Sequence, residues 1–293
     1  MKVAVFPGQG AQFTGMAETL TALGPRAEAL MAQADEVVGF ALSETMASGT
    51  EEELQQTRVT QPAIYVHSVV RALLEGDRLG PTTVAGHSLG EFSAPAAVGA
   101  LDFADGLRLV SRRAEAMQAA GEANPGTMAA ILGLDDDVVA GICAATEGVV
   151  VAANYNCPGQ LVISGEVDAV ERAMASCTEA GAKRALRLNV GGAFHSPLME
   201  PAREALEEAI AETELRTPRA KIYQNVDARP HTDPAIIRGN LIAQLTAPVR
   251  WTATVQAMIA DGATDFVEVG GRGGVLRGLI RKIDRNAVVE SLA

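Results

Sequence analysis

Apolar and polar positions along the chain follow two different periods. Short apolar runs bounded by turn residues indicate buried strands, whereas helical spacing of apolar residues indicates helices packed on one face. Strand-like runs occur at residues 2–6, 82–85, 221–225 and 266–269. Helical spacing occurs at residues 25–38, 61–75, 89–100, 103–120, 197–214, 249–261 and 275–284. Strands that alternate with helices in this way are typical of a parallel sheet covered by helices.

The stretch from residue 125 to 190 has an order of its own. Strands are predicted at residues 127–134, 149–154, 160–164 and 183–190, with a turn at 156–159. Helices are predicted at residues 136–146 and 167–180. The resulting order, βαββαβ, is the ferredoxin-like pattern. We therefore predict a small ferredoxin-like subdomain at residues 125–190, inserted into a large α/β subdomain formed by residues 1–124 and 191–293.

Composition narrows the class of protein. The 36 acidic and 24 basic residues give a formal net charge of −12, which disfavours nucleic acid as a partner. A membrane-spanning segment is not expected, and Pro7 and Gly8 break the first strand too soon for a signal peptide. Cys143, Cys157 and Cys177 show no C-x-x-C spacing, so we expect reduced thiols in a cytoplasmic protein. Only Cys157 falls in a loop-like stretch, and it is a weak candidate for a nucleophile.

The strongest chemical signal is a G-x-S-x-G run between a predicted strand and a predicted helix, Gly86-His87-Ser88-Leu89-Gly90. Its glycines permit a tight turn that lifts the Ser88 hydroxyl clear of the sheet, as in a nucleophile elbow. The helix that follows adds free backbone N–H groups near the reacting oxygen. An ordinary glycine-rich loop is the alternative, but the strand–turn–helix setting favours a nucleophile. The predicted fold class is α/β, a large α/β-hydrolase-like parallel-sheet domain with the inserted ferredoxin-like subdomain.

A serine nucleophile needs a base, and histidine is the usual one. His67 lies in an apolar helix, where a packed or capping histidine is the simpler interpretation. His87 adjoins Ser88, so its side chain should point away from that of Ser88, and His231 lies in a polar loop where we expect it to be solvated. His195 lies where the chain leaves the small subdomain for the large one. Active sites favour such clefts, so His195 is the predicted base.

The glycine-rich segment at residues 8–12 resembles a nucleotide-binding turn only superficially. A dinucleotide fingerprint needs a third glycine where Phe13 stands, and a Walker loop needs Gly-Lys-Ser/Thr. Glycines at the carboxyl end of a strand can instead present backbone N–H donors to an oxyanion. We predict that the N–H groups of Gln9 and Leu89 form this oxyanion hole.

Six segments form a set that is specific as a whole. They are Phe6-Pro7-Gly8-Gln9-Gly10-Ala11-Gln12, Thr60-Gln61-Pro62-Ala63, Gly86-His87-Ser88-Leu89-Gly90-Glu91, Asn154-Tyr155-Asn156-Cys157-Pro158-Gly159-Gln160, Phe194-His195-Ser196-Pro197-Leu198-Met199 and Gln244-Leu245-Thr246-Ala247-Pro248-Val249. In this order, across almost the whole chain, they resemble the malonyl-CoA:acyl carrier protein transacylases. The acyltransferase domains of polyketide synthases are similar.

The resemblance implies a serine–histidine dyad rather than a triad. Backbone carbonyl groups, one of them at Gln244, orient the imidazole of His195, which fits the lack of an acidic residue suited to a third position. The resemblance also implies that Arg113 holds the free carboxylate of malonate, since a guanidinium can grip a carboxylate through two parallel hydrogen bonds. A solvated charge is the alternative for Arg113, and its neighbour Arg112 is expected at the surface. Phe194 is expected to wall the acyl pocket.

Two features depart from the family pattern. Pro95 falls inside the helix after the elbow, where a missing backbone donor should kink or shorten that helix. The loop Gly270-Gly271-Arg272-Gly273-Gly274 is one residue longer than the family's usual Gly-Pro-Gly turn. Neither feature touches the predicted dyad.

The function implied by the resemblance is transfer of a malonyl group from malonyl-CoA to the phosphopantetheine thiol of an acyl carrier protein. The reaction would be ping-pong, through an ester of Ser88, in fatty-acid or polyketide synthesis. The resemblance implies no bound cofactor or metal, and a monomer. A hydrolase that strips acyl groups from carrier proteins is the alternative, against which Arg113 counts. A non-catalytic carrier-docking module is a third interpretation, which an intact Ser88 and His195 disfavour.

Carrier docking should use a local basic patch, because the family's carrier proteins are acidic and this chain is acidic overall. The candidates are Lys183 and Arg184 at the last strand of the small subdomain, and Arg277, Arg281 and Lys282 on the last predicted helix. Arg277 and Arg281 are four residues apart and share one helix face. A solvated helix face is the alternative. No nucleic-acid or membrane partner is expected.

Overall fold

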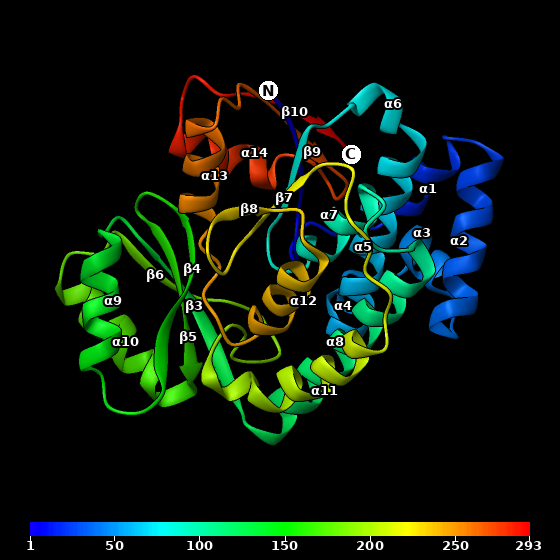
Figure 1. Ribbon diagram of the computed structural model, residues 1–293. Helices are drawn as coiled ribbons and strands as arrows, with labels where there is room; N and C mark the ends of the chain where they lie inside the picture. The colour runs from blue at the N-terminus through cyan, green and yellow to red at the C-terminus, as the bar shows by residue number, and fades with distance from the viewer.

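The computed structural model describes all 293 residues, apart from the side chains of Asp77 and Arg78. Its larger sheet has the strand order β10-β9-β1-β2-β7-β8, with helices on both sides (Figure 1). The strands are β1 (Lys2–Phe6), β2 (Thr83–Gly86), β7 (Lys221–Gln224), β8 (Arg229–His231), β9 (Asp265–Val269) and β10 (Val288–Leu292). Neighbouring strands pair in parallel, except that β8 pairs antiparallel with β7. The predicted parallel sheet is confirmed.

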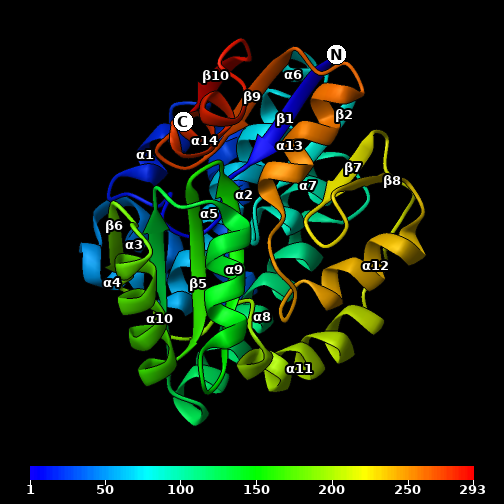
Figure 2. The same cartoon turned by 90° about the vertical axis from the view of Figure 1, so that its left-hand side faces the viewer.

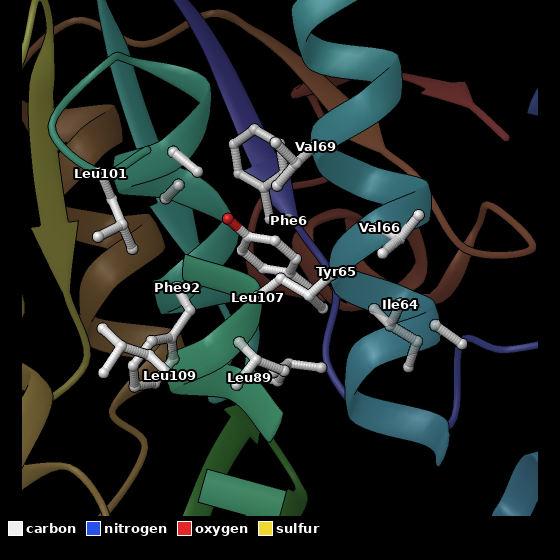
Figure 3. Close-up of a cluster of buried hydrophobic side chains, with 14 of the residues drawn as sticks. Phe6, Ile64, Tyr65, Val66, Val69, Leu89, Phe92, Leu101, Leu107 and Leu109 are labelled. Atoms are coloured by element: carbon white, nitrogen blue, oxygen red, sulfur yellow. The ribbon is translucent and has the colours of Figure 1, made fainter. Parts of the chain in front are cut away.

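Strand β1 shows how this sheet divides the core. The helices packed on its two faces are α5 (Thr57–Leu74), α7 (Gly90–Ala97), α8 (Phe103–Ala123), α13 (Trp251–Ala260) and α14 (Val275–Ile283). Val3 and Val5 belong to the cluster with α13 and α14, and Ala4 and Phe6 belong to the larger cluster with α5, α7 and α8. Figure 3 shows Phe6 next to Tyr65 of α5 in this larger cluster. Alternation along the strand therefore places apolar side chains in both layers.

Tyr65 fixes α5 against α8. Its hydroxyl donates a hydrogen bond to the Phe103 carbonyl oxygen at 3.1 Å, and the two rings are 6.0 Å apart. A Cβ atom on Gly106 would lie 2.1 Å from the Tyr65 hydroxyl oxygen, so the close approach requires glycine. These contacts set the relative position of two helices that both contribute to the site described below.

The second sheet lies at one side of the molecule and has the strand order β4-β5-β3-β6 (Figure 2). Its elements are β3 (Gly126–Leu132), α9 (Asp136–Ala145), β4 (Val150–Cys157), β5 (Gln160–Glu166), α10 (Val167–Glu179) and β6 (Arg184–Arg187). All its strand pairs are antiparallel. Ile131 and Ile163 pack under α9 and α10, whereas Met128 and Val162 face the main core. The predicted βαββαβ order is confirmed; the proposed boundaries at residues 125 and 190 remain a prediction.

Backbone hydrogen bonds join strand β4 of the small sheet to the segment before α13. The Tyr155 N–H of β4 donates to the Val249 carbonyl oxygen at 2.9 Å, and the Val249 N–H donates to the Ala153 carbonyl oxygen at 2.8 Å. Residue 249 lies in the segment that leads into α13. The small sheet is thus hydrogen-bonded to the large subdomain along its β4 edge.

Several boundaries and assignments differ from the sequence predictions. The helix with Pro95 is short and ends at Ala97, as expected. The strand expected at residues 183–190 is limited to β6, and β4 extends to a buried Cys157 where a turn was predicted. The prediction of a solvated loop around His231 is wrong. His231 lies in β8 with its side chain 13% exposed and its Nε2 2.8 Å from Asp227 Oδ2.

The remaining helices complete the outer layers. They are α1 (Met16–Thr21), α2 (Pro25–Val38), α3 (Leu42–Ser48), α4 (Glu51–Gln55), α6 (Gly76–Leu79), a 3-10 turn (Pro197–Met199), α11 (Glu200–Ala211) and α12 (Pro234–Ala243). Among the residues that the structure describes, none of the helices combines the length and apolar character needed to cross a membrane.

Candidate active site

Ser88 occupies a sharp turn between β2 and α7. Its φ angle is 51°, in the left-handed region that non-glycine residues rarely adopt. A Cβ atom on Gly86 would lie 1.9 Å from the Gly90 carbonyl carbon, and one on Gly90 would lie 2.1 Å from the Phe6 carbonyl oxygen. Both positions therefore require glycine, Gly86 for the tight turn and Gly90 for its close approach to β1. The geometry is that of a nucleophile elbow.

His195 lies directly against Ser88. Its Nε2 is 2.8 Å from Ser88 Oγ, and its Nδ1 is 2.8 Å from the Gln244 carbonyl oxygen. A carbonyl oxygen only accepts hydrogen bonds, so Nδ1 carries the proton and Nε2 is free to accept one from Ser88. His195 itself has a φ angle of 59°. Burial and the charge of Arg113 lower the pKa of His195 to about 3, so the imidazole is neutral at physiological pH.

The other histidines are held in different places. His67 is buried, with its Nε2 2.8 Å from Thr19 Oγ1, and its Nδ1 accepts a hydrogen bond from the Gly271 N–H. His87 turns away from the nucleophile, and its Nε2 is 2.8 Å from Asn156 Oδ1. The structure thus brings His195 to Ser88 Oγ and gives His67 and His87 other partners.

Arg113 of α8 is 1% exposed and extends to the nucleophile. Its Nη2 donates to Ser88 Oγ at 3.1 Å and to Gln244 Oε1 at 3.0 Å, and its Nη1 donates to Gln61 Oε1 at 2.7 Å. Burial lowers the pKa of Arg113 to about 10, so the guanidinium is still charged at neutral pH. The neighbouring Arg112 is exposed and pairs with a glutamate on the same helix face.

Residues not assigned a role from the sequence surround these groups. Asn225, just beyond β7, accepts a hydrogen bond from the Ser88 N–H at 2.9 Å and donates to the Gly86 carbonyl oxygen at 2.8 Å. Glu91, in the first turn of α7, is buried and accepts from the Asn225 N–H at 2.8 Å. Glu91 directly follows the G-x-S-x-G run, and this position could have marked it as a residue of the site. No comparable signal marked Asn225.

The dyad opens into a hollow of about 430 Å³ between the large sheet and the small subdomain. Gln9 and Leu89, the predicted oxyanion donors, both line it, as does Phe194. Residues of the small subdomain line it too: Met128, Asn154, Leu188, Asn189 and Val190. The carboxyl ends of β1, β2 and β7 meet here, which is the usual place for ligands in an open parallel sheet.

The glycine loop after β9 forms part of the same wall. Gly270, Gly271, Gly273 and Gly274 all have positive φ angles, so the loop is built from conformations that favour glycine. Between them, Arg272 donates through Nη2 to the Gln12 carbonyl oxygen at 2.6 Å and lines the hollow. This glycine loop therefore adds a cation to the rim of the site.

The predicted docking residues are exposed, and none of them is among the residues that line the hollow. They are Lys183, Arg184, Arg277 and Arg281, with Lys282 beside them. Lys282 Nζ donates to Gln160 Oε1 at 3.1 Å, which places the end of α14 against the β4–β5 turn.

The comparisons with known proteins agree on one family. The model of the acyl transferase domain matches residues 3–292. The malonyl CoA-acyl carrier protein transacylase of Haemophilus influenzae is 44% identical over 95% of this chain and 91% of its own length. The transacylase of the same name from Bacillus subtilis is 43% identical over 96% of this chain and 90% of its own length.

Solved structures agree with the sequence relatives. The malonyl-CoA:acyl carrier protein transacylase of Xanthomonas oryzae superposes with a TM-score of 0.95 at 43% identity, covering 100% of this chain and 94% of that one. A malonyl-transacylase in complex with a type II PKS acyl-carrier protein superposes with a TM-score of 0.95 at 38% identity, covering 99% and 95%. The similarity therefore extends over both subdomains.

Proposed function

Because this chain belongs to the acyl transferase domain family, we propose that its reaction passes through a malonyl ester of Ser88. The enzyme transfers a malonyl group to an acyl carrier protein, the activity for which its relatives are named. The observation that carries the proposal is the position of Ser88 Oγ, 2.8 Å from His195 Nε2 and 3.1 Å from Arg113 Nη2. One oxygen lies against both a neutral base and a buried cation.

In the first half-reaction His195 Nε2 takes the proton of Ser88, and Oγ attacks the thioester carbonyl carbon of malonyl-CoA. The N–H groups of Gln9 and Leu89 stabilise the negative charge that develops on the carbonyl oxygen. The carbon–sulfur bond then breaks, and the departing thiolate of coenzyme A takes the proton from His195. Ser88 is left as the malonyl ester.

The second half-reaction uses the same groups in reverse. The phosphopantetheine thiol of the carrier protein gives its proton to His195 and attacks the ester carbonyl carbon. The bond to Ser88 Oγ breaks, and Oγ takes the proton back. The dyad, Arg113 and both oxyanion donors come from one chain, which supports a monomer as the acting unit.

Arg113 and Phe194 select the acyl group. The guanidinium is close enough to Ser88 to bind the free carboxylate of a malonyl group esterified there, and Gln61 and Gln244 hold it in place. Phe194 walls the hollow beside His195 and would crowd a methyl branch at C2 of the acyl group. This arrangement favours malonyl over acetyl and methylmalonyl groups.

The carrier protein docks on basic residues around the β4–β5 turn. The Gly133 N–H donates to the Gly159 carbonyl oxygen, and the Lys183 side chain packs over Gly133. Lys282 also reaches this turn, because its Nζ donates to Gln160. Cations of the small subdomain and of α14 therefore flank one turn, which supports a single patch for an acidic partner.

Intact-mass measurement tests the ester directly. Wild-type protein mixed with malonyl-CoA should gain one malonyl group, which holo-acyl carrier protein then removes. Ser88→Ala should gain none, because no other hydroxyl lies at the elbow. A Ser88→Ala protein that is malonylated at the wild-type rate would contradict the proposal. Ser93 is a buried serine of α7, the helix after the elbow, so Ser93→Ala is the matched control and should react normally.

A further inference from the structure

Glu91 is a buried carboxylate behind the dyad to which the proposed reaction assigns no role. It lies in the first turn of α7 and is 1% exposed. Its Oε1 accepts from the Asn225 N–H at 2.8 Å, and its Oε2 accepts from Gln244 Nε2 at 2.8 Å. A buried charge is costly unless it is paired or hydrogen-bonded, so a residue that only filled space here would be apolar.

The carboxylate favours the orientation of the Gln244 amide in which the amide oxygen faces Arg113. A carboxylate only accepts hydrogen bonds, so Glu91 holds the NH₂ end of the amide, which also donates to the Ser88 carbonyl oxygen at 3.2 Å. The opposite end, Oε1, must then face Arg113 Nη2, 3.0 Å away. With the amide reversed, two donors would face each other and Arg113 would lose an acceptor.

The charges of Glu91 and Arg113 also connect these two residues. Burial raises the pKa of Glu91, while the Asn225 N–H, the charge of Arg113 and the Gln244 amide oppose that rise and favour the carboxylate. The charge of Glu91 in turn opposes the fall in the pKa of Arg113 that burial causes. The two groups thus act as buried counter-ions with the Gln244 amide between them.

We propose that Glu91 is a positioning residue for acyl-group selection, which acts by orienting the Gln244 amide so that Arg113 is aimed at the malonyl carboxylate. The inference rests on the proposed function, because it takes Arg113 as the group that binds malonate. Glu91 does not touch the substrate. Its effect reaches the substrate through Gln244 and Arg113.

Glu91→Gln tests the orientation with little change in shape. The Asn225 N–H is fixed in the backbone, so the new amide must accept from it and turn its own NH₂ end to Gln244. The two NH₂ groups are then donors that face each other, which displaces the Gln244 amide and weakens its charge-assisted hydrogen bond with Arg113. We expect kcat/KM for malonyl-CoA to fall about 10- to 100-fold, and that for acetyl-CoA to change less than about threefold. Glu115→Gln makes the same chemical change on the exposed face of α8 and should leave both unchanged.

Exchanging the two side chains provides the rescue. In Glu91→Gln/Gln244→Glu, the glutamate at 244 accepts from both Arg113 and the new amide, and the Gln244 backbone carbonyl that holds His195 is retained. We expect the malonyl-to-acetyl ratio of kcat/KM to return to within about fivefold of wild type. Gln244→Glu alone places two carboxylates together and should not show this recovery.

Three results would overturn the inference. They are an unchanged malonyl-to-acetyl ratio in Glu91→Gln, an equal loss of both activities, or an exchange variant with no recovery of the ratio. Thermal melting shows whether each variant folds like the wild type. If Glu91→Gln does not fold, the malonyl-to-acetyl ratio of the exchange variant alone tests the inference. Failure of the proposed function is distinguishable, since wild type would then form no malonyl ester or show no malonyl preference.

Discussion

His195 is surrounded by groups that oppose its protonation. Burial and the charge of Arg113 lower its pKa to about 3, so the base form persists well below neutral pH. Reaction of Ser88 with phenylmethylsulfonyl fluoride, a neutral serine reagent, should therefore keep nearly the same rate from pH 8 to pH 5. A histidine of ordinary pKa, about 6.5, would lose roughly 30-fold over that range.

The pH dependence of this reaction can also be compared between the wild type and Arg113→Ala. Arg113→Ala removes the second-largest cause of the lowered pKa of His195, so its rate should begin to fall at a higher pH than that of wild type. A tenfold loss per pH unit below about 6.5 in the wild type would show that His195 is not held neutral.

Arg113 also allows a test of acyl-group selection. Losing one partner of a buried charge pair costs on the order of 2–5 kcal/mol, which corresponds to roughly thirty-fold to several thousand-fold in rate. Arg113→Ala should lower malonyl transfer by that factor, while acetyl transfer holds steady or rises, because acetyl has no carboxylate. Acyl-enzyme formation from malonyl-, methylmalonyl- and acetyl-CoA measures this.

Arg112→Ala on the exposed face of the same helix is the control and should behave like wild type. A wild type that prefers acetyl-CoA would contradict the role of Arg113 in holding malonate. So would an Arg113→Ala variant that loses malonyl and acetyl transfer equally. Either result would favour the hydrolase alternative.

At the scale of helices and strands, the sequence predicts the features that depend on neighbouring residues. The elbow could be predicted because Gly86 and Gly90 flank Ser88 within one strand–turn–helix unit. Asn225 could not, because its contact with Ser88 depends on β2 pairing with β7, which lies more than a hundred residues along the chain. The order of strands in a sheet depends on tertiary packing, so a local sequence pattern does not predict it.

Three of the elements that the sequence analysis missed are β8, β10 and α12, and each has a feature that weakens its local pattern. Strand β8 contains Pro230, which is tolerated because β8 is an edge strand. In β10, Glu290 and Ser291 interrupt the apolar run of another edge strand. Helix α12 begins with a capping Asp233 whose side chain accepts from the Ala235 N–H, but Gly239 weakens its helical signal. Edge position and tertiary contacts stabilise these elements.

At the scale of the whole molecule, net charge and local charge act in opposite directions. The chain carries a formal net charge of −12, so an acidic carrier protein is repelled unless a basic patch offsets the field. Lys183→Glu and Arg281→Glu should each raise KM for the carrier several-fold and leave KM for malonyl-CoA unchanged. Steady-state kinetics at two salt concentrations measures both. Equal effects on the two substrates would argue against a docking patch.

The connection of β4 to residue 249 has a mechanical consequence. Ala153 and Tyr155 are both bonded to Val249, and Val249 lies five residues after Gln244, whose carbonyl oxygen holds His195. A hinge motion that separated the small sheet from the large one would break these bonds and displace the base. The width of the entrance is therefore tied to the alignment of the dyad. We therefore expect both half-reactions to take place in a site of the same width.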